Sequence, residues 1–172
     1  MLARTATILK WALYAAAACL CLMVQGAVLQ RFTIWGVIPF LYPLLAAIPA
    51  TYETPVSATV FALCVGIVCD LLLPGSIPCL YTLLFPLAGL CGALLSRSLL
   101  PAGPLCSLAA GAAAFLLTDG FRCFVLWING RAAWRAAGFL MVREFLVTAP
   151  LIIPMTLLFR AVARRARALI ET

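Results

Sequence analysis

The sequence predicts an all-α polytopic integral membrane protein with six transmembrane helices in a single domain, residues 1–172. Of the 172 residues, 66% are hydrophobic and only 10% are charged, and the mean hydropathy is +1.18. Soluble domains carry about 25% charged residues, so this chain has too few to cover a water-facing surface. Apolar windows long enough for helical crossings are present, whereas the alternating segments of a β-barrel are not. The predicted spans are residues 11–29, 33–50, 56–73, 79–95, 104–127 and 136–159, followed by a basic tail, 160–172.

The first two spans differ in their expected regularity. The first follows a short basic leader and is predicted to be a retained anchor, because its apolar run continues well past Ala16-Ala17-Ala18-Cys19. Those four residues loosely resemble the cleavage box of a lipoprotein signal, which is the alternative interpretation. The second span contains Pro39, Pro43 and Pro49. Prolines remove backbone hydrogen-bond donors, so we expect this helix to be kinked or broken.

Turn residues and glycines organise the next two spans. Tyr52-Glu53-Thr54-Pro55 precedes the third span, with Pro55 suited to a first helical turn, and Pro74-Gly75 ends it. Gly66 lies in the third span, and Gly89 and Gly92 lie in the fourth. Small residues let helix backbones approach closely in lipid, so these glycines are predicted to pack helices together or to contact a partner.

The distribution of Arg and Lys predicts the orientation in the membrane. Both ends of the chain are basic, which suits an even number of spans with both termini in the cytoplasm. The predicted cytoplasmic side holds seven basic residues and the opposite side three, Arg31, Arg131 and Arg135. We interpret the tail as a short basic helix on the inner headgroups, or simply as a positive-inside signal. The predicted contacts with anionic lipid are Arg160, Arg164, Arg165 and Arg167.

Five charged residues lie within the apolar windows: Asp70, Asp119, Arg122, Arg143 and Glu144. A charge at the centre of a membrane helix costs roughly 2.5–3.5 kcal/mol on insertion scales, so each needs a partner. Under the six-span topology all five fall roughly 5–12 Å below the outer boundary. We therefore predict a buried polar cluster, in which the arginines neutralise some of the acids. The alternative is that both arginines extend to the headgroups and that Asp70 simply ends a helix.

The sequence offers little for catalysis or metal binding. The chain has no His, and its eight cysteines lack the spacing of a metal site, so we interpret them as small buried hydrophobic residues. Glycine-rich phosphate loops, zinc motifs and nucleophile elbows are also absent. We predict no catalytic residues, no metal, no cofactor and no nucleic-acid partner.

Three stretches of the chain form a recognisable combination. They are Leu29-Gln30 through Pro39, then Gly66-Ile67-Val68-Cys69-Asp70-Leu71-Leu72, and the glycine-bearing fourth span. Together they resemble the rod shape-determining protein MreD family. Gly66 and Asp70 match the "Gly-x-x-x-Asp-Leu" signature of that family. The resemblance implies a bacterial inner-membrane protein whose fold is similar to the substrate-binding subunits of energy-coupling-factor transporters.

The same resemblance implies a non-catalytic scaffold of the cell-elongation machinery, which acts in rod shape and lateral peptidoglycan synthesis. An MreC-like membrane protein is the implied partner, with the wall-synthesis glycosyltransferase and transpeptidase and MreB filaments beyond it. Two other functions stay open. One is a substrate-binding membrane subunit of a small-molecule (vitamin-type) transporter with the polar cluster as its pocket, and the other is a membrane enzyme acting on lipid-linked substrates.

Overall fold

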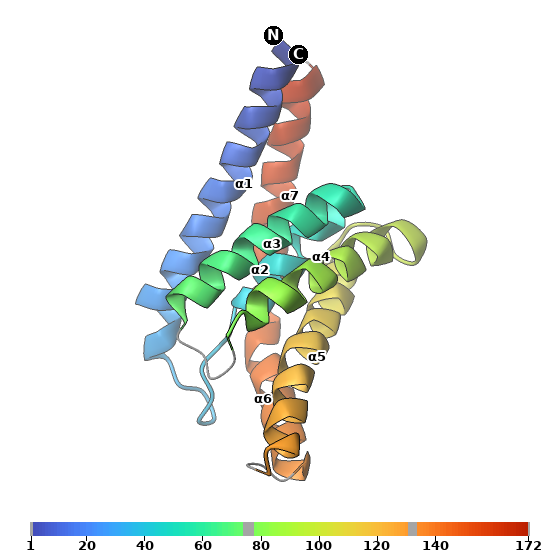
Figure 1. Ribbon diagram of the computed structural model, residues 1–172. Helices are drawn as coiled ribbons and strands as arrows, with labels where there is room; N and C mark the ends of the chain where they lie inside the picture. Colours follow the sequence, from blue (N-terminus) through green and yellow to red (C-terminus); the bar gives the residue numbers. More distant parts are fainter. Residues whose placement is uncertain (1, 74–77, 131–133, 172) are drawn as a thin grey trace.

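A computed structural model describes residues 2–73, 78–130 and 134–171 of the chain (Figure 1). Within these ranges, five helices are long and apolar enough to cross a membrane, so the prediction of a helical membrane protein is confirmed. The predicted Pro74-Gly75 turn and Arg131 lie outside the described residues. The long helices are α1 (Leu2–Ala27), α3 (Pro55–Leu72), α4 (Leu80–Ser98), α5 (Pro104–Ile128) and a bent helix made of α6 (Trp134–Thr148), η3 (Ala149–Leu151) and α7 (Ile152–Glu171).

The prediction of six transmembrane helices is wrong at the second one, whereas the expected break in that helix is confirmed. Residues 33–50 do not form one helix: an irregular stretch leads into the short helix α2 (Tyr42–Ala47) and the 3₁₀ turn η2 (Pro49–Tyr52). The prolines explain the interruption, because Pro43 and Pro49 occupy first-turn positions, where no backbone donor is needed, and each lies at the start of a new short helix. Every residue from 41 to 51 is buried, so the segment is enclosed by protein.

This broken segment runs beside much of α1. At its start, the side chain of Gln25 on α1 bonds the backbone of Pro39 and Leu41. At its end, Glu53 pairs with Lys10, also on α1. Lys10 and Gln25 are about 22 Å apart along α1 at the helical rise, a large part of a hydrocarbon core. The chain therefore returns along α1, and the start of α1 and the end of α7 lie at the same end of the molecule (Figure 1).

Polar side chains satisfy the irregular backbone before α2. Gln25 is 2% exposed; its amide nitrogen donates to the carbonyl of Pro39 at 3.0 Å, and its amide oxygen accepts from the N–H of Leu41 at 2.8 Å. The N–H of Phe40 donates to Thr148 Oγ1 at 3.0 Å. Non-helical backbone at membrane depth is tolerated only where such groups find partners inside the protein. Two polar residues of α1 and α6 thus make the broken segment possible.

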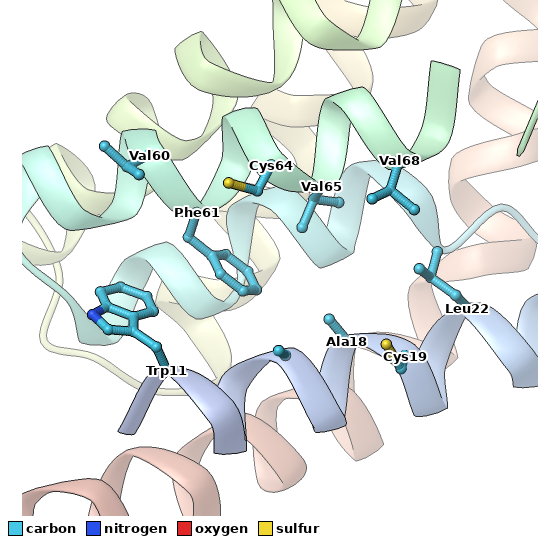
Figure 2. Close-up of a pocket in the computed structure, with 10 residues that line it drawn as sticks. Trp11, Ala18, Cys19, Leu22, Val60, Phe61, Cys64, Val65 and Val68 are labelled. Atoms are coloured by element: carbon cyan, nitrogen blue, oxygen red, sulfur yellow. The ribbon is translucent and has the colours of Figure 1, made fainter. Parts of the chain in front are cut away.

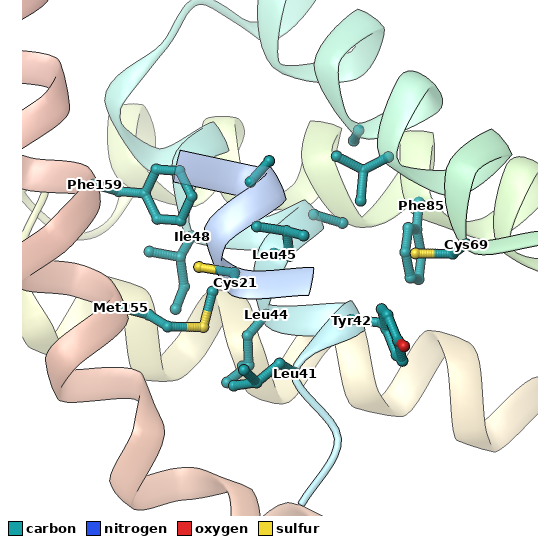
Figure 3. Close-up of a cluster of buried hydrophobic side chains, with 14 of the residues drawn as sticks. Cys21, Leu41, Tyr42, Leu44, Leu45, Ile48, Cys69, Phe85, Met155 and Phe159 are labelled. Carbon is teal, nitrogen blue, oxygen red and sulfur yellow. The ribbon is translucent and has the colours of Figure 1, made fainter. Parts of the chain in front are cut away.

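The hydrophobic core is built around α2 (Figure 3). Leu44 and Leu45 of this helix, and Ile48 directly after it, are at most 1% exposed, and they meet side chains from both ends of the chain. Met155 and Phe159 approach from α7, and the remaining walls come from α1, α3 and α4. The centre of the protein is therefore occupied by a six-residue helix, with the long helices around it.

The basic tail continues the last long helix. The predicted boundary at residue 159 falls inside α7, and the arginines from Arg160 onward belong to the same helix. Ala163 and Ala166 are buried, while Arg160, Arg164, Arg165 and Arg167 are exposed. α7 packs along α1 (Figure 1), where the rings of Tyr14 and Phe159 stack with their centroids 6.2 Å apart. The tail thus packs its small residues against the protein and turns its charges outward.

Helix α4 crosses its neighbours at glycines. A Cβ atom built on Gly89 would lie 2.7 Å from Ala62 Cβ and 3.1 Å from the carbonyl oxygen of Ala58, both on α3. A Cβ on Gly92 would lie 2.8 Å from the carbonyl oxygen of Ala47. These distances are shorter than van der Waals contact, so only glycine permits the observed approach of the helices.

We expect the Gly89→Ala variant to be less stable than the wild type by about 1–3 kcal/mol, because the added methyl group forces α3 and α4 apart. Thermal unfolding of the purified protein in detergent measures the loss. Gly120→Ala is the matched control, since nothing lies within 4 Å of its Cβ position. Equal stability of the two variants would contradict the close packing of α3 and α4.

Candidate functional site

Asp70 lies in the last turn of α3 and caps the beginning of α4. Its Oδ1 accepts a hydrogen bond from the N–H of Tyr81 at 3.2 Å. Its Oδ2 accepts from the N–H of Thr82 at 2.7 Å and from Thr82 Oγ1 at 2.6 Å. The first N–H groups of a helix have no partner within the helix, and its positive end attracts a carboxylate. The partner that offsets the cost of burying this charge is therefore a helix N-terminus.

Helix α4 does not supply this cap from its own residues. Cys79 occupies its N-cap position with a left-handed backbone conformation, φ 56°, and makes no side-chain capping bond. A thiol is a weak hydrogen-bond acceptor, so it cannot replace the usual hydroxyl, amide or carboxylate there. The carboxylate of Asp70 takes that role from the preceding helix, across a connection of seven residues, 73–79.

Gly66 lies one helical turn before Asp70 and makes the cap reachable. A Cβ atom on Gly66 would lie 2.6 Å from the carbonyl oxygen of Tyr81 and 3.0 Å from the Cα of Thr82. Residues four apart share a helix face, so Gly66 admits the first turn of α4 and Asp70 binds the same turn. The spacing Gly66-x-x-x-Asp70 thus has one structural meaning, a close helix approach combined with a cap.

Three of the five predicted cluster residues come together, where α5 meets α6. Asp119 and Arg122 are neighbours on α5, with Arg122 Nη1 4.0 Å from Asp119 Oδ1, and Glu144 on α6 is within electrostatic range of both. Asp119 is 4% exposed, and its two carboxylate oxygens make no hydrogen bond to any described residue. This is a buried acid whose hydrogen-bonding capacity is unused.

The other two predicted cluster residues lie apart from this group. Asp70 makes its hydrogen bonds with α4 and none with an arginine that the structure describes. Arg143 lies beside Gly36 in the irregular stretch, and its guanidinium is 5.7 Å from the ring centroid of Phe139. Tyr81 connects the two regions, because its N–H binds Asp70 while its side chain is within electrostatic range of Arg122, Asp119 and Glu144.

Sequence reasoning missed the polar residues that hold the broken segment. Gln25 and Thr148 bind its beginning, and Lys10 pairs with Glu53 at its end, with Nζ and Oε2 2.5 Å apart. Gln25 carried a usable signal, because an amide inside an otherwise apolar span needs a hydrogen-bond partner. Thr148 carried none, since its hydroxyl can bond its own helix and does so, to the carbonyl of Glu144.

An apolar groove of about 440 Å³ lies between α1 and α3 (Figure 2). Trp11 and Phe61 flank one end, and Leu22 and Val68 the other. Small side chains form much of the floor on the α1 side. The complete lining is Trp11, Ala15, Ala18, Cys19, Leu22, Val60, Phe61, Cys64, Val65 and Val68. The groove is thus an apolar surface between two helices that are long and apolar enough to cross a membrane.

Among the described residues, no group of three or more His, Cys, Asp or Glu side chains is placed to hold a metal ion. Comparisons with protein-family models, with curated proteins and with solved structures find no match to this chain. The fold and the site define a helical membrane protein that contains a carboxylate-capped helix pair and an apolar groove.

The two aspartates, Asp70 and Asp119, should respond differently to the same substitution. We expect Asp70→Leu to lower the free energy of unfolding by about 2–3 kcal/mol, because two N–H groups of α4 lose their acceptor. Asp119→Leu should leave stability unchanged or raise it, since it removes a buried acid that makes no hydrogen bond to any described residue. Thermal unfolding in detergent compares them, and similar losses in both variants would contradict these assignments.

Proposed function

We propose that the protein is a non-catalytic membrane scaffold of the bacterial cell-elongation machinery, with the role that its resemblance to MreD implies. The observation that carries the proposal is the apolar groove between α1 and α3. It would hold a transmembrane helix of an MreC-like partner. One wall of the groove is α3, the helix that bears Gly66 and Asp70. The bond from Asp70 to α4 therefore also holds this wall in place.

The shape of the groove favours a helix as its occupant. Association of helices within lipid depends on close packing, because lipid chains are as apolar as the helices themselves. Ala15 and Cys19, one turn apart on α1, and Cys64 on α3 are small and exposed. A third helix can therefore bring its backbone close to both walls. Trp11 and Phe61 would bound it at one end.

The ends of the chain support a bacterial inner-membrane location with both termini in the cytoplasm. The start of α1 and the end of α7 lie together (Figure 1). Four exposed arginines belong to the last part of α7. Positive charge of this kind favours the cytoplasmic face and anionic lipid. MreB filaments and the wall-synthesis enzymes would then be within reach of this end.

A second candidate function is the binding subunit of a small-molecule transporter. The group of Asp119, Arg122 and Glu144 favours it, because Asp119 has unused acceptors that a bound molecule would satisfy. Its ligand would carry a positive charge, since the group contains two acids and one arginine. Retained stability but lost uptake in Asp119→Leu would favour this function.

Filling the groove tests the scaffold. We expect Ala15→Phe to abolish recovery of the MreC-like partner when the tagged protein is captured from detergent-solubilised native membranes and analysed by mass spectrometry. The substituted side chain would occupy the groove and displace the partner helix. Ala16→Phe is the matched control, because Ala16 is exposed on the same helix outside the groove and should retain the partner.

Equal recovery of the partner with both phenylalanine variants would show that the partner does not bind in the groove. Recovery of paired ATPases, with no wall-synthesis protein, would replace the scaffold with the transporter subunit.

A further inference from the structure

A second pocket, polar rather than apolar, lies at the end of the molecule that holds the two chain ends. Its volume is about 340 Å³, and four separate elements form it: α1, η2 with the residues that follow it, the end of α4, and the last part of α7. The lining residues are Lys10, Thr51, Tyr52, Glu53, Thr54, Ser96, Arg97, Ala166 and Arg167. Positive charge therefore comes to one place from α1, α4 and α7.

The charges in this pocket are unbalanced. Lys10, Arg97 and Arg167 face one carboxylate, Glu53, which is already paired with Lys10. An ammonium group has three donors, so Lys10 keeps two after this pairing. Arg97 and Arg167 form no salt bridge with any described acid. The pocket thus offers two guanidinium groups and part of an ammonium group to an anion.

The beginning of α3 adds to the positive potential. Thr54 is both a lining residue and the N-cap of this 18-residue helix. The N-terminal end of a helix carries a partial positive charge that favours anions. Guanidinium groups bind phosphate in a bidentate manner, and Arg97 and Arg167 come from different helices. An anion bound between them would join α4 to α7.

We infer that this pocket binds the phosphate of an anionic phospholipid headgroup. The inference does not depend on the proposed function. The pocket residues of α4 and α7 lie near the ends of helices that are long and apolar enough to cross a membrane. The acyl chains would follow these helices while the phosphate stays between Arg97 and Arg167. Such a site differs from general attraction of lipid to the basic tail. It binds a single lipid molecule, and the affinity for that lipid depends on Arg97 and Arg167 rather than on every arginine of α7.

The test is a lipid titration of the purified full-length protein in neutral detergent, followed by native mass spectrometry. We expect one phosphatidylglycerol to bind far more tightly than phosphatidylcholine. Arg97→Gln and Arg167→Gln should each weaken phosphatidylglycerol binding about fivefold, the effect of removing one basic residue near a charged headgroup. Arg165→Gln is the matched control: Arg165 is exposed on the same helix but does not line the pocket.

Several outcomes would overturn the inference. An equal loss of affinity in Arg165→Gln and Arg167→Gln would show that lipid binding depends on the general charge of the tail and not on the pocket. Equal affinity for phosphatidylcholine would show that the pocket does not recognise the negative charge of the headgroup. Displacement of the lipid by inorganic phosphate alone would make a soluble phosphate compound the ligand instead. Because Arg97 and Arg167 are exposed, unchanged thermal unfolding of their variants separates lost binding from lost folding.

Discussion

The binding of Asp70 to the first turn of α4 is the interaction on which the arrangement of the bundle depends. It joins two long helices at a point where α4 has no cap of its own, and Gly66 allows the approach that it needs. The groove uses one side of α3, and the glycine crossings of α4 use the other. A carboxylate in a membrane helix is expensive, and here it is compensated by backbone N–H groups that would otherwise be equally expensive.

The sequence predicted the long helices well, because each is an apolar window between Pro, Gly or polar residues. It failed at residues 33–50, where composition alone cannot separate a lipid-facing helix from a broken segment enclosed by protein. The prolines indicated a break, yet the hydrogen bonds that stabilise it come from Gln25 and Thr148, which are distant in the chain. Only the three-dimensional arrangement brings them together.

The charged residues illustrate the same limit. The pairing of Asp119 with Arg122 follows from their spacing on one helix, and the sequence also placed Glu144 near them. The partner of Asp70 could not be predicted from the sequence. A common depth in the membrane indicated arginine side chains as partners, whereas the actual partners are backbone N–H groups at the start of the next helix. The polar pocket was hidden for a similar reason: Arg97 and Arg167 are separated by the whole of α5 and α6.

The central position of α2 has a consequence for how the protein is made. This segment is enclosed by helices from both halves of the chain, and the N–H of Phe40 finds its acceptor 108 residues later, at Thr148. While the chain emerges from the ribosome, its irregular backbone must wait for α6 and α7. Until the last helices enter the membrane, residues 39–50 lack the side chains of α6 and α7 that bury them and bind their backbone. Folding of the central segment is therefore completed only when the C-terminal helices have been inserted. A chain truncated before α6 would leave this segment exposed to the quality-control proteases of the membrane.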